Sequence, residues 1–493
     1  MSIKNYSSVF YFILFCIVFY FFAKVHPLFV FDTDDWLYVQ DSRDGQAWPV
    51  WELWNPTKIF PEFLMPAVSW LSLIFVYPFS NDYIGSLSIG YAFSLSVFVL
   101  SSAIFLHRLL NVIFKSSFFE SFLCTVLFVA FLFFPIFKKD TVYLLHAADV
   151  TCVFNYTIPA LLNISLCFFL LYSDSKALLD GVFKKLSILI FVLYFCLNSN
   201  LFQSIILVSF AIASIIISLI SNWKKTKTLG VITLIKDNYL FAGIVLYWIV
   251  VLLYEANGER ASEAHSDLFS LSYLDTLSCL WLRIKRLHSF YLFLLLTNLL
   301  GGLLYFLRSR KNKVNHEDLN YIRVIKLLFI SFVVTLTFVF LLCSKVGASY
   351  IARPDVAISY LISLLGMSII SVMYLLKRIK VLITIFPILV MIVAFYTIFS
   401  SVKYSETSYI SGPISAAKQI GSDIVDKIVN AADNGLEHIE ISIPKFNDGD
   451  NFPLANYGVN RIPKALFFHS IIRKQIDVKF ILDPSMNKKY HIN

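Results

Sequence analysis

The sequence predicts an all-α polytopic membrane protein with a small α/β domain at its C-terminus. Of its 493 residues, 58% are apolar, 15% are charged and 49 are Phe, a composition typical of chains that cross a membrane many times. Long apolar segments without a formal charge recur along the sequence. In lipid only helices and closed barrels satisfy their own backbone groups, and the alternating segments of a barrel do not occur in this sequence, which favours a helical bundle.

Apolar length and helix breakers predict about eleven membrane-spanning helices. They cover residues 8–25, 84–106, 119–137, 156–173, 186–198, 203–221, 239–254, 289–307, 327–343, 357–376 and 381–402. An odd number of spans places the two termini on opposite sides of the membrane. The first apolar run, Val9 to Ala23, follows Lys4 as it would in a secretory signal peptide. Lys24 occupies the place where a cleavage site needs small neutral residues, so we expect a retained helix.

Orientation follows from the distribution of basic residues. Lys and Arg gather in one alternate set of loops, most densely from Arg308 to Lys313, which makes this set cytoplasmic. The N-terminus is then cytoplasmic and the C-terminus lies outside. One more apolar segment, residues 63–79, is interrupted by Pro66 and Pro78. If it crossed the membrane the Arg308 cluster would lie outside, so we expect a juxtamembrane or re-entrant helix on the outer face, although its length also allows a span.

Two domains follow from this topology. Residues 1–402 form the membrane domain, which includes a large first outer loop at 26–83, and residues 403–493 form a small α/β domain on the same side as that loop. Within the second domain, apolar periodicity predicts two helices and two strands. They cover helix 413–432, strand 438–444, helix 462–473 and strand 478–482.

Several classes of function are disfavoured by composition. The seven cysteines form no CxxC pair and fall mainly inside apolar segments, where cysteine packs as a small hydrophobic residue rather than as a zinc ligand or disulfide. The formal charge of +9 does not indicate nucleic-acid binding, because the basic residues lie in short loops between helices.

The candidate site begins with three carboxylates directly after the first span, Asp32, Asp34 and Asp35, in the stretch VFDTDDWLYV. Crowded beside a low-dielectric slab they repel one another, so we expect at least one raised pKa and a proton acceptor near neutral pH. Asp34 and Asp35 cannot both point inward on a helix or strand. One is expected to face the site, while the other orients it, binds a metal or caps the next segment. The alternative is that all three form an N-cap cluster for a juxtamembrane helix.

Cationic residues lie in other outer loops, among them Lys139, Arg260 and Arg353. Guanidinium and ammonium groups hold phosphates by charge-assisted hydrogen bonds, so these residues suit an anionic headgroup at membrane level. Arg260 and Arg353 could instead anchor their loops to lipid headgroups. His146, with Asp149 three residues later, is expected to be a loop or cap residue rather than a ligand.

This arrangement resembles the GT-C superfamily of integral-membrane glycosyltransferases. An acidic motif in a large first outer loop, juxtamembrane helices, many spans and a small outer C-terminal domain are shared along the whole chain. More narrowly, DTDDW with the downstream NGERAS and YIARPD resembles the bacterial and prophage O-antigen glucosyltransferases that change lipopolysaccharide serotype, the type-specific Gtr family. The motifs are short, and their order along the chain carries most of the resemblance.

The resemblance implies a transferase of the bacterial inner membrane, with its C-terminal domain in the periplasm. Such enzymes move a sugar, which the resemblance implies to be glucose here, from an undecaprenyl-phosphate carrier to the O-antigen polysaccharide and invert the anomeric centre. By resemblance Asp34 is the general base, Asp35 positions it or takes part in a metal site, and Arg260 and Arg353 hold the carrier phosphate. Asp32 is an additional acid, so the base could be displaced by two residues, and NGER stands where a Pro-Gly pair is common.

Three points stay open from sequence. A divalent cation, Mg²⁺ or Mn²⁺, could be required or dispensable, because adjacent carboxylates serve in both ways. An O-antigen polymerase also has many spans and large outer loops. A transporter or flippase of lipid-linked sugar is the third alternative, although the span centres carry few charges, unlike those of most transporters.

Overall fold

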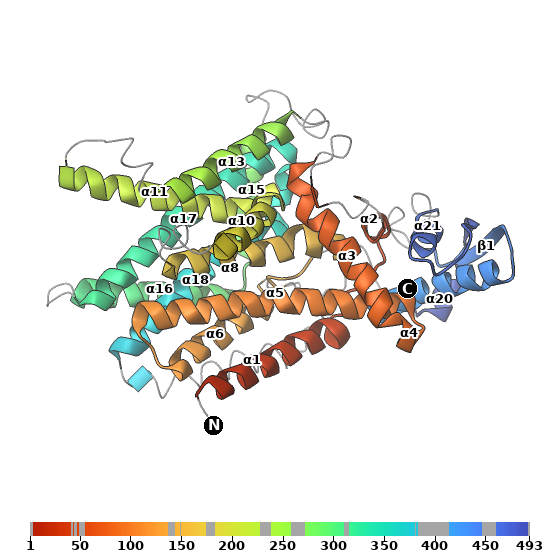
Figure 1. Cartoon of the computed structure of the whole chain (residues 1–493), viewed down its shortest axis with the longest axis horizontal. Helices are drawn as coiled ribbons and strands as arrows, with labels where there is room; N and C mark the ends of the chain where they lie inside the picture. Colours follow the sequence, from red (N-terminus) through yellow and green to blue (C-terminus); the bar gives the residue numbers. More distant parts are fainter. Residues whose placement is uncertain are drawn as a thin grey trace.

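The computed structural model describes residues 3–40, 43, 47–48, 55–136, 143–147, 149–173, 183–226, 238–257, 272–309, 315–379, 381–382, 414–445 and 460–491. Helices dominate this part of the chain, and most of them lie in one elongated bundle with the C-terminal segment at one end (Figure 1). The long apolar helices are α1 (Ile3–Tyr20), α5 (Tyr83–Phe114), α6 (Phe118–Phe133), α8 (Ile158–Tyr172), α10 (Phe183–Leu197), α11 (Leu201–Thr226), α13 (Tyr239–Ala256), α16 (Ser289–Ser309), α17 (His316–Val346) and α18 (Pro354–Arg378).

The all-α polytopic class is confirmed. Nine helical segments in the described ranges are long and apolar enough to cross a membrane, and α6 and α10 are shorter apolar helices. Each of the first ten predicted spans overlaps one of the helices named above. The last predicted span, 381–402, lies outside the described residues except for its first two positions.

Small polar residues allow the central helices to approach closely. Nearly all of α18 is buried, whereas most of α1 faces outward. Inside the bundle Ser209 of α11 shares hydrogen bonds with Ser331 and Thr335 of α17, with oxygen–oxygen distances of 2.7 and 2.8 Å. Small side chains and hydroxyl pairs of this kind stabilise helix contacts where lipid supplies no hydrophobic driving force.

The segment predicted at 63–79 forms α3 (Ile59–Phe75) and the short α4 (Tyr77–Ser80). By length α3 could span, but contacts place both of its ends at the same end of the bundle. At its start, the Phe60 amide donates to the Asn198 carbonyl at the end of α10. After α4, Tyr83 opens α5 and stacks on Trp36 with ring centroids 6.3 Å apart. Figure 1 shows α3 lying obliquely across α5 near this end.

The C-terminal segment contains α20 (Ile414–Asp433), β1 (His438–Ile443), α21 (Arg461–Phe468), β2 (Asp477–Leu482) and α22 (Met486–Lys489). The two strands pair in parallel, with His438 opposite Asp477 and Ile443 opposite Leu482. The predicted helix and strand order is therefore present, and the sheet has two strands in the described ranges. The predicted helix 462–473 is too long, because Ser470 adopts a positive φ of 60°, which ends α21.

The C-terminal segment contacts the membrane helices at the end where α3 lies (Figure 1). The Arg461 Nη1 donates to the Thr33 carbonyl at 2.9 Å. The Tyr83 hydroxyl and His469 Nδ1 are 2.9 Å apart, and the ring of Trp70 packs on His469. Burial lowers the pKa of His469 to about 4, so the ring is neutral at pH 7 and Nδ1 can accept from the hydroxyl.

One helix of more than ten residues in the described ranges is absent from the sequence-based prediction. It is α15 (Tyr273–Arg286), which is too short and too charged to be a span. It packs against the 3₁₀ turn η6 (Ala348–Ala352), which directly precedes α18.

Close packing of α3 on α5 predicts a specific stability effect. A Cβ on Gly90 of α5 would contact the Ser72 Oγ and lie 2.9 Å from the Ser72 Cβ, whereas a Cβ on Gly243 of α13 has no neighbour within 4 Å. We expect Gly90→Ala to lower the free energy of unfolding by about 1–3 kcal/mol through overpacking. Gly243→Ala, the matched control, should leave it unchanged or raise it.

The measurement is the Tm of the purified protein in one detergent. Adding Ser72→Gly to Gly90→Ala should restore part of the lost stability, because it removes the contacted atoms. Equal Tm values for Gly90→Ala and Gly243→Ala would contradict this packing of α3.

Candidate functional site

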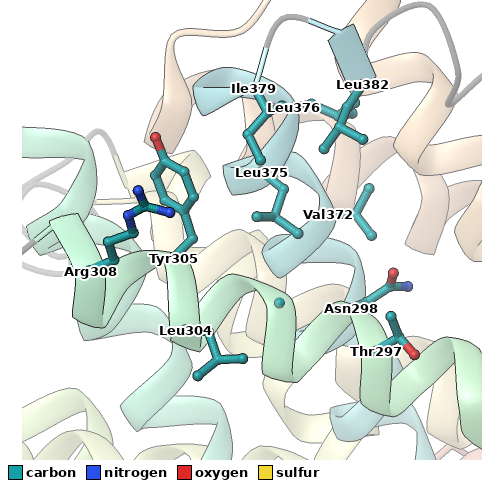
Figure 2. Close-up of a pocket in the computed structure, with 11 residues that line it drawn as sticks. Thr297, Asn298, Leu304, Tyr305, Arg308, Val372, Leu375, Leu376, Ile379 and Leu382 are labelled. Atoms are coloured by element: carbon teal, nitrogen blue, oxygen red, sulfur yellow. The ribbon is translucent and has the colours of Figure 1, made fainter.

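Three cavities formed by described residues differ in chemistry. The first, of about 490 Å³, is an apolar groove between α16 and α18. Figure 2 shows Arg308 beside Tyr305 at one end of this groove and Asn298 with Thr297 at the other, with apolar side chains between them. The second, of about 700 Å³, lies at the C-terminal ends of α5 and α8 and has a mixed lining with one charged residue, Arg323.

The third cavity, of about 460 Å³, is mainly polar and combines acidic with basic side chains. We call it the acidic–basic cavity. It is lined by Asp32, Thr33, Asp34, Tyr38, Lys58, Asp149, Thr151, Cys152, Asn155, Tyr156, Asn200, Tyr350, Arg353 and Arg461. It therefore unites the acids that follow the first span with Arg353, from more than half the chain away, and it is the candidate functional site.

The acidic motif forms the start of the short helix α2 (Thr33–Tyr38). Asp32 is its N-cap, and its Oδ1 accepts from the Asp34 amide at 2.9 Å. Asp35 completes a capping box, since its Oδ2 accepts from the Asp32 amide at 3.3 Å. The N-cap alternative is thus correct for Asp32 and Asp35.

Asp35 is fully buried and lies behind the cavity lining. Its carboxylate accepts four hydrogen bonds, from the amides of Phe31, Asp32 and Thr151 and from the Thr151 hydroxyl. Burial, together with the charges of Asp149 and Asp32, raises the pKa of Asp35 well above its usual value, while the bonds from Thr151 oppose this rise. Asp35 therefore fastens the acidic motif to the start of α7 (Val150–Cys152).

Asp34 differs from both neighbours. Its side chain is exposed at the cavity, and its carboxylate has no hydrogen bond or ion pair with any residue in the described ranges. Its backbone amide donates a hydrogen bond to the Asp32 carboxylate. Of the three motif acids, Asp34 is the one whose oxygens remain available to a ligand.

Asp149 is a fourth acid of the site, and in the sequence only its spacing from His146 drew notice to it. It is the N-cap of α7, and its Oδ1 and Oδ2 accept from the amide and the thiol of Cys152. Burial, with the nearby charge of Asp32 as the next cause, raises the pKa of Asp149 to about 7. Burial is also the largest cause that raises the pKa of Asp32, to about 6. The sequence predicted at least one raised pKa among the three motif acids, and the pKa is raised at Asp32 and Asp35.

Arg353 is held in place on the cavity wall. Its Nε and Nη2 donate to the two carboxylate oxygens of Asp355, and Nη2 also lies 3.2 Å from the Cys152 sulfur. The guanidinium is 5.4 Å from the ring centroid of Tyr156 and 5.0 Å from that of Tyr350. These contacts orient the planar fork and leave about a third of the side chain exposed.

Two more cations line the cavity, and the sequence did not single them out as site residues. Lys58, just before α3, donates to the Tyr38 hydroxyl at 2.8 Å. Arg461 comes from α21, more than four hundred residues after Thr33, whose carbonyl it contacts. No local pattern indicates such a contact, because it depends on how the C-terminal segment docks.

Helix N-termini also converge on this cavity. Asp149 and Thr151 lie at the start of the helical run that continues into α8, Asn200 directly precedes α11, and Arg353 is the N-cap of α18. The partial positive charge at the N-terminus of a helix favours an anion. The cavity thus combines these partial positive charges with cationic side chains and with carboxylates.

Other expected site residues lie elsewhere. Lys139 and Arg260 are outside the described residues. His146 is buried beside His26 and Tyr143, with ring centroids 5.7 Å away in each case, and burial lowers its pKa to about 3. It is therefore a loop residue, as expected, and its ring is packed in the interior.

A metal centre finds little support in the ligand geometry. Among the described residues no group of three or more His, Cys, Asp or Glu side chains is close enough to hold an ion. The two carboxylates that cap α2 and α7 already accept hydrogen bonds from backbone amides.

Comparison of the chain with protein-family models, with curated proteins and with solved structures found no match. The fold and site define a class rather than a family: an all-α polytopic membrane protein with an acidic–basic cavity at one end of its bundle.

The different environments of Asp34 and Asp35 predict different effects on stability. Asp35→Ala leaves the Thr151 amide and hydroxyl without their acceptor, so we expect the free energy of unfolding to fall by about 2–4 kcal/mol. Asp34→Ala removes no contact with a described residue, so its Tm should stay close to that of the wild type. A loss of stability in Asp34→Ala as large as that in Asp35→Ala would contradict this assignment.

The raised pKa values of Asp32 and Asp149 predict a pH dependence. In the unfolded chain the pKa of an aspartate is about 3.9. In the folded state the pKa is about 6 for Asp32 and about 7 for Asp149. Between about pH 4 and 7 the folded protein binds more protons, so this contribution to stability falls as the pH rises. Asp149→Asn keeps a capping side chain but cannot ionise. Its Tm should exceed the wild-type value at pH 8 by more than at pH 5, and parallel Tm profiles would refute the raised pKa.

Proposed function

We propose that the acidic–basic cavity catalyses inverting transfer of a sugar from a polyprenyl-phosphate donor to a glycan acceptor. The observation that carries this proposal is the carboxylate of Asp34, which has no hydrogen bond or ion pair with a described residue, in a cavity that also contains Lys58, Arg353 and Arg461. A transferase of this kind needs one proton acceptor and a cationic site for a phosphate leaving group, and both are present.

The donor phosphate fits the positive features of the cavity. Arg353 and Arg461 place guanidinium groups on the cavity wall, where Nε and Nη2 of Arg353 also pair with Asp355, and the N-termini of α11 and α18 add partial positive charge. Because phosphate is a good leaving group, the main tasks are positioning and stabilisation of the departing charge. The polyprenyl chain would remain in the bilayer beside the bundle.

The reaction balances with this chain's own groups. Asp34 accepts the proton of an acceptor hydroxyl while the hydroxyl oxygen bonds to the anomeric carbon of the donor. The bond between that carbon and the phosphate oxygen breaks, and its electron pair leaves with the polyprenyl phosphate. Attack opposite the leaving group inverts the anomeric centre.

The assignment of the base to Asp34 rests on what the other acids already do. Asp35 accepts four hydrogen bonds away from the cavity, and Asp32 caps α2. Asp149 lines the cavity but is engaged with Cys152. Its raised pKa suits a proton acceptor near neutral pH, so Asp149→Asn is the informative comparison with Asp34→Asn.

The proposal also includes the number of spans and their orientation. With eleven spans, a cytoplasmic N-terminus and the GT-C-like arrangement, the cavity and a periplasmic α/β C-terminal domain lie on the outer side of the bacterial inner membrane. Undecaprenyl phosphate is then the carrier, and the lipopolysaccharide O-antigen is the acceptor. Glucose is the sugar implied by resemblance. Mg²⁺ or Mn²⁺ has no step in this mechanism.

The central test is sugar transfer by the purified protein in detergent, with a polyprenyl-phosphate glucose and an O-antigen acceptor. Asp34→Asn should reduce kcat by about a thousandfold, since it removes the base. Asp433→Asn, an exposed acid on α20, is the matched control and should retain full activity. Full activity of Asp34→Asn would refute this base. Polymer shortening without loss of sugar addition would indicate a polymerase instead.

A second experiment tests the part played by α21. Arg461→Gln removes a cation from the cavity wall, so we expect the KM for the donor to rise about fivefold to tenfold, with a smaller change in kcat. Lys464→Gln lies on the same helix with an exposed side chain and serves as the control. An unchanged KM in Arg461→Gln would exclude this residue from donor binding.

A further inference from the structure

The helix α15 lies across one end of the bundle rather than through it. At its start the Ser272 amide donates to the Ser344 carbonyl, near the end of α17, at 3.1 Å. Just after it, the His288 amide donates to the Ile136 carbonyl, beyond the end of α6, at 2.7 Å. Both anchor points are at the end of the bundle that carries the acidic–basic cavity, because Arg353 follows α17 by only a few residues.

The side of α15 that faces the protein is mixed, whereas large apolar side chains are exposed on the side that faces away. Thr276 is fully buried and accepts from a hydroxyl of α17 at 3.1 Å, and the partly buried Leu280 packs against the hydrophobic core. Leu274, Leu277 and Trp281, spaced at i, i+3 and i+7, are 82%, 54% and 55% exposed. This spacing places the three side chains on one face of the helix. In water such a group of exposed apolar side chains would be unfavourable.

Charge at the end of α15 indicates what covers this face. Lys285 and Arg286 close the helix, and the Lys285 ammonium lies 5.1 Å from the ring centroid of Trp281. A helix with Leu and Trp on one face and basic residues beside them is typical of membrane interfaces, where rings sit at headgroup level and cations bind lipid phosphates. The exposed Phe293 of α16 and Leu341 of α17, on the neighbouring spans, continue the apolar surface.

We propose that α15 is an interfacial helix bound to the phospholipid leaflet on the side of the acidic–basic cavity. Leu274, Leu277 and Trp281 insert at the boundary between headgroups and acyl chains, and Lys285 and Arg286 bind lipid phosphates. Because α15 packs on η6, which directly precedes Arg353, lipid binding also holds one wall of the cavity at membrane level. The proposal concerns a lipid contact and does not depend on which reaction the cavity carries out.

The test uses the fluorescence of Trp281 in the full-length protein, reconstituted with lipids brominated either near the headgroup or near the chain end. The Trp281 signal is the difference between wild type and Trp281→Phe. We expect quenching at least about twofold stronger with the shallow bromine than with the deep one. The control is the Trp36 signal, taken from Trp36→Phe, because Trp36 is 1% exposed and should not be quenched.

A second measurement, of Tm, tests the contribution of Lys285 and Arg286. With the Lys285→Gln, Arg286→Gln double variant, the gain in Tm that anionic lipid confers on the wild type should fall by at least about half. Failure of the sugar-transfer assay would leave both of these measurements interpretable. Stronger quenching by the deep bromine, no quenching by either, or an unchanged lipid effect in the double variant would overturn the proposal.

Discussion

The candidate site depends on the hydrogen bonds that the buried carboxylate of Asp35 accepts. A charged group in a buried position is costly unless its oxygens are satisfied, and here four donors satisfy them. Those donors come from two segments more than a hundred residues apart. The bond to Thr151 therefore sets the distance between the acidic motif and the helical run that carries Asp149 and Cys152.

The three acids of the motif DTDDW therefore have different roles. Asp32 and Asp35 form a capping box at the start of α2. Asp34 lies between them in the sequence, and its side chain is exposed. The capping box holds the backbone beneath the Asp34 side chain, whose carboxylate has no hydrogen bond or ion pair with a described residue. The neighbouring acids are thus structural supports that leave one side chain available.

The cationic side of the cavity comes from segments that are distant in sequence. Arg353 is oriented by Asp355 and by two aromatic rings, Lys58 precedes the oblique helix α3, and Arg461 arrives with α21. Helix N-termini add partial positive charge beside these side chains. The cavity therefore combines cationic side chains with carboxylates at one end of the bundle.

Apolar length was enough to locate ten helices and to recognise residues 63–79 as a separate case, because spanning a bilayer is a property of a contiguous stretch. Local periodicity also found the helices and strands of the C-terminal segment, although Ser470 ended α21 early. Apolar length did not predict the charged helix α15, whose apolar face turns away from the protein. Equally, the motif DTDDW indicated an acidic site but not which acid is free. That choice, and the meeting of Asp34 with Arg353 and Arg461, depended on long-range packing, because contacts between residues hundreds of positions apart leave no local pattern in one sequence.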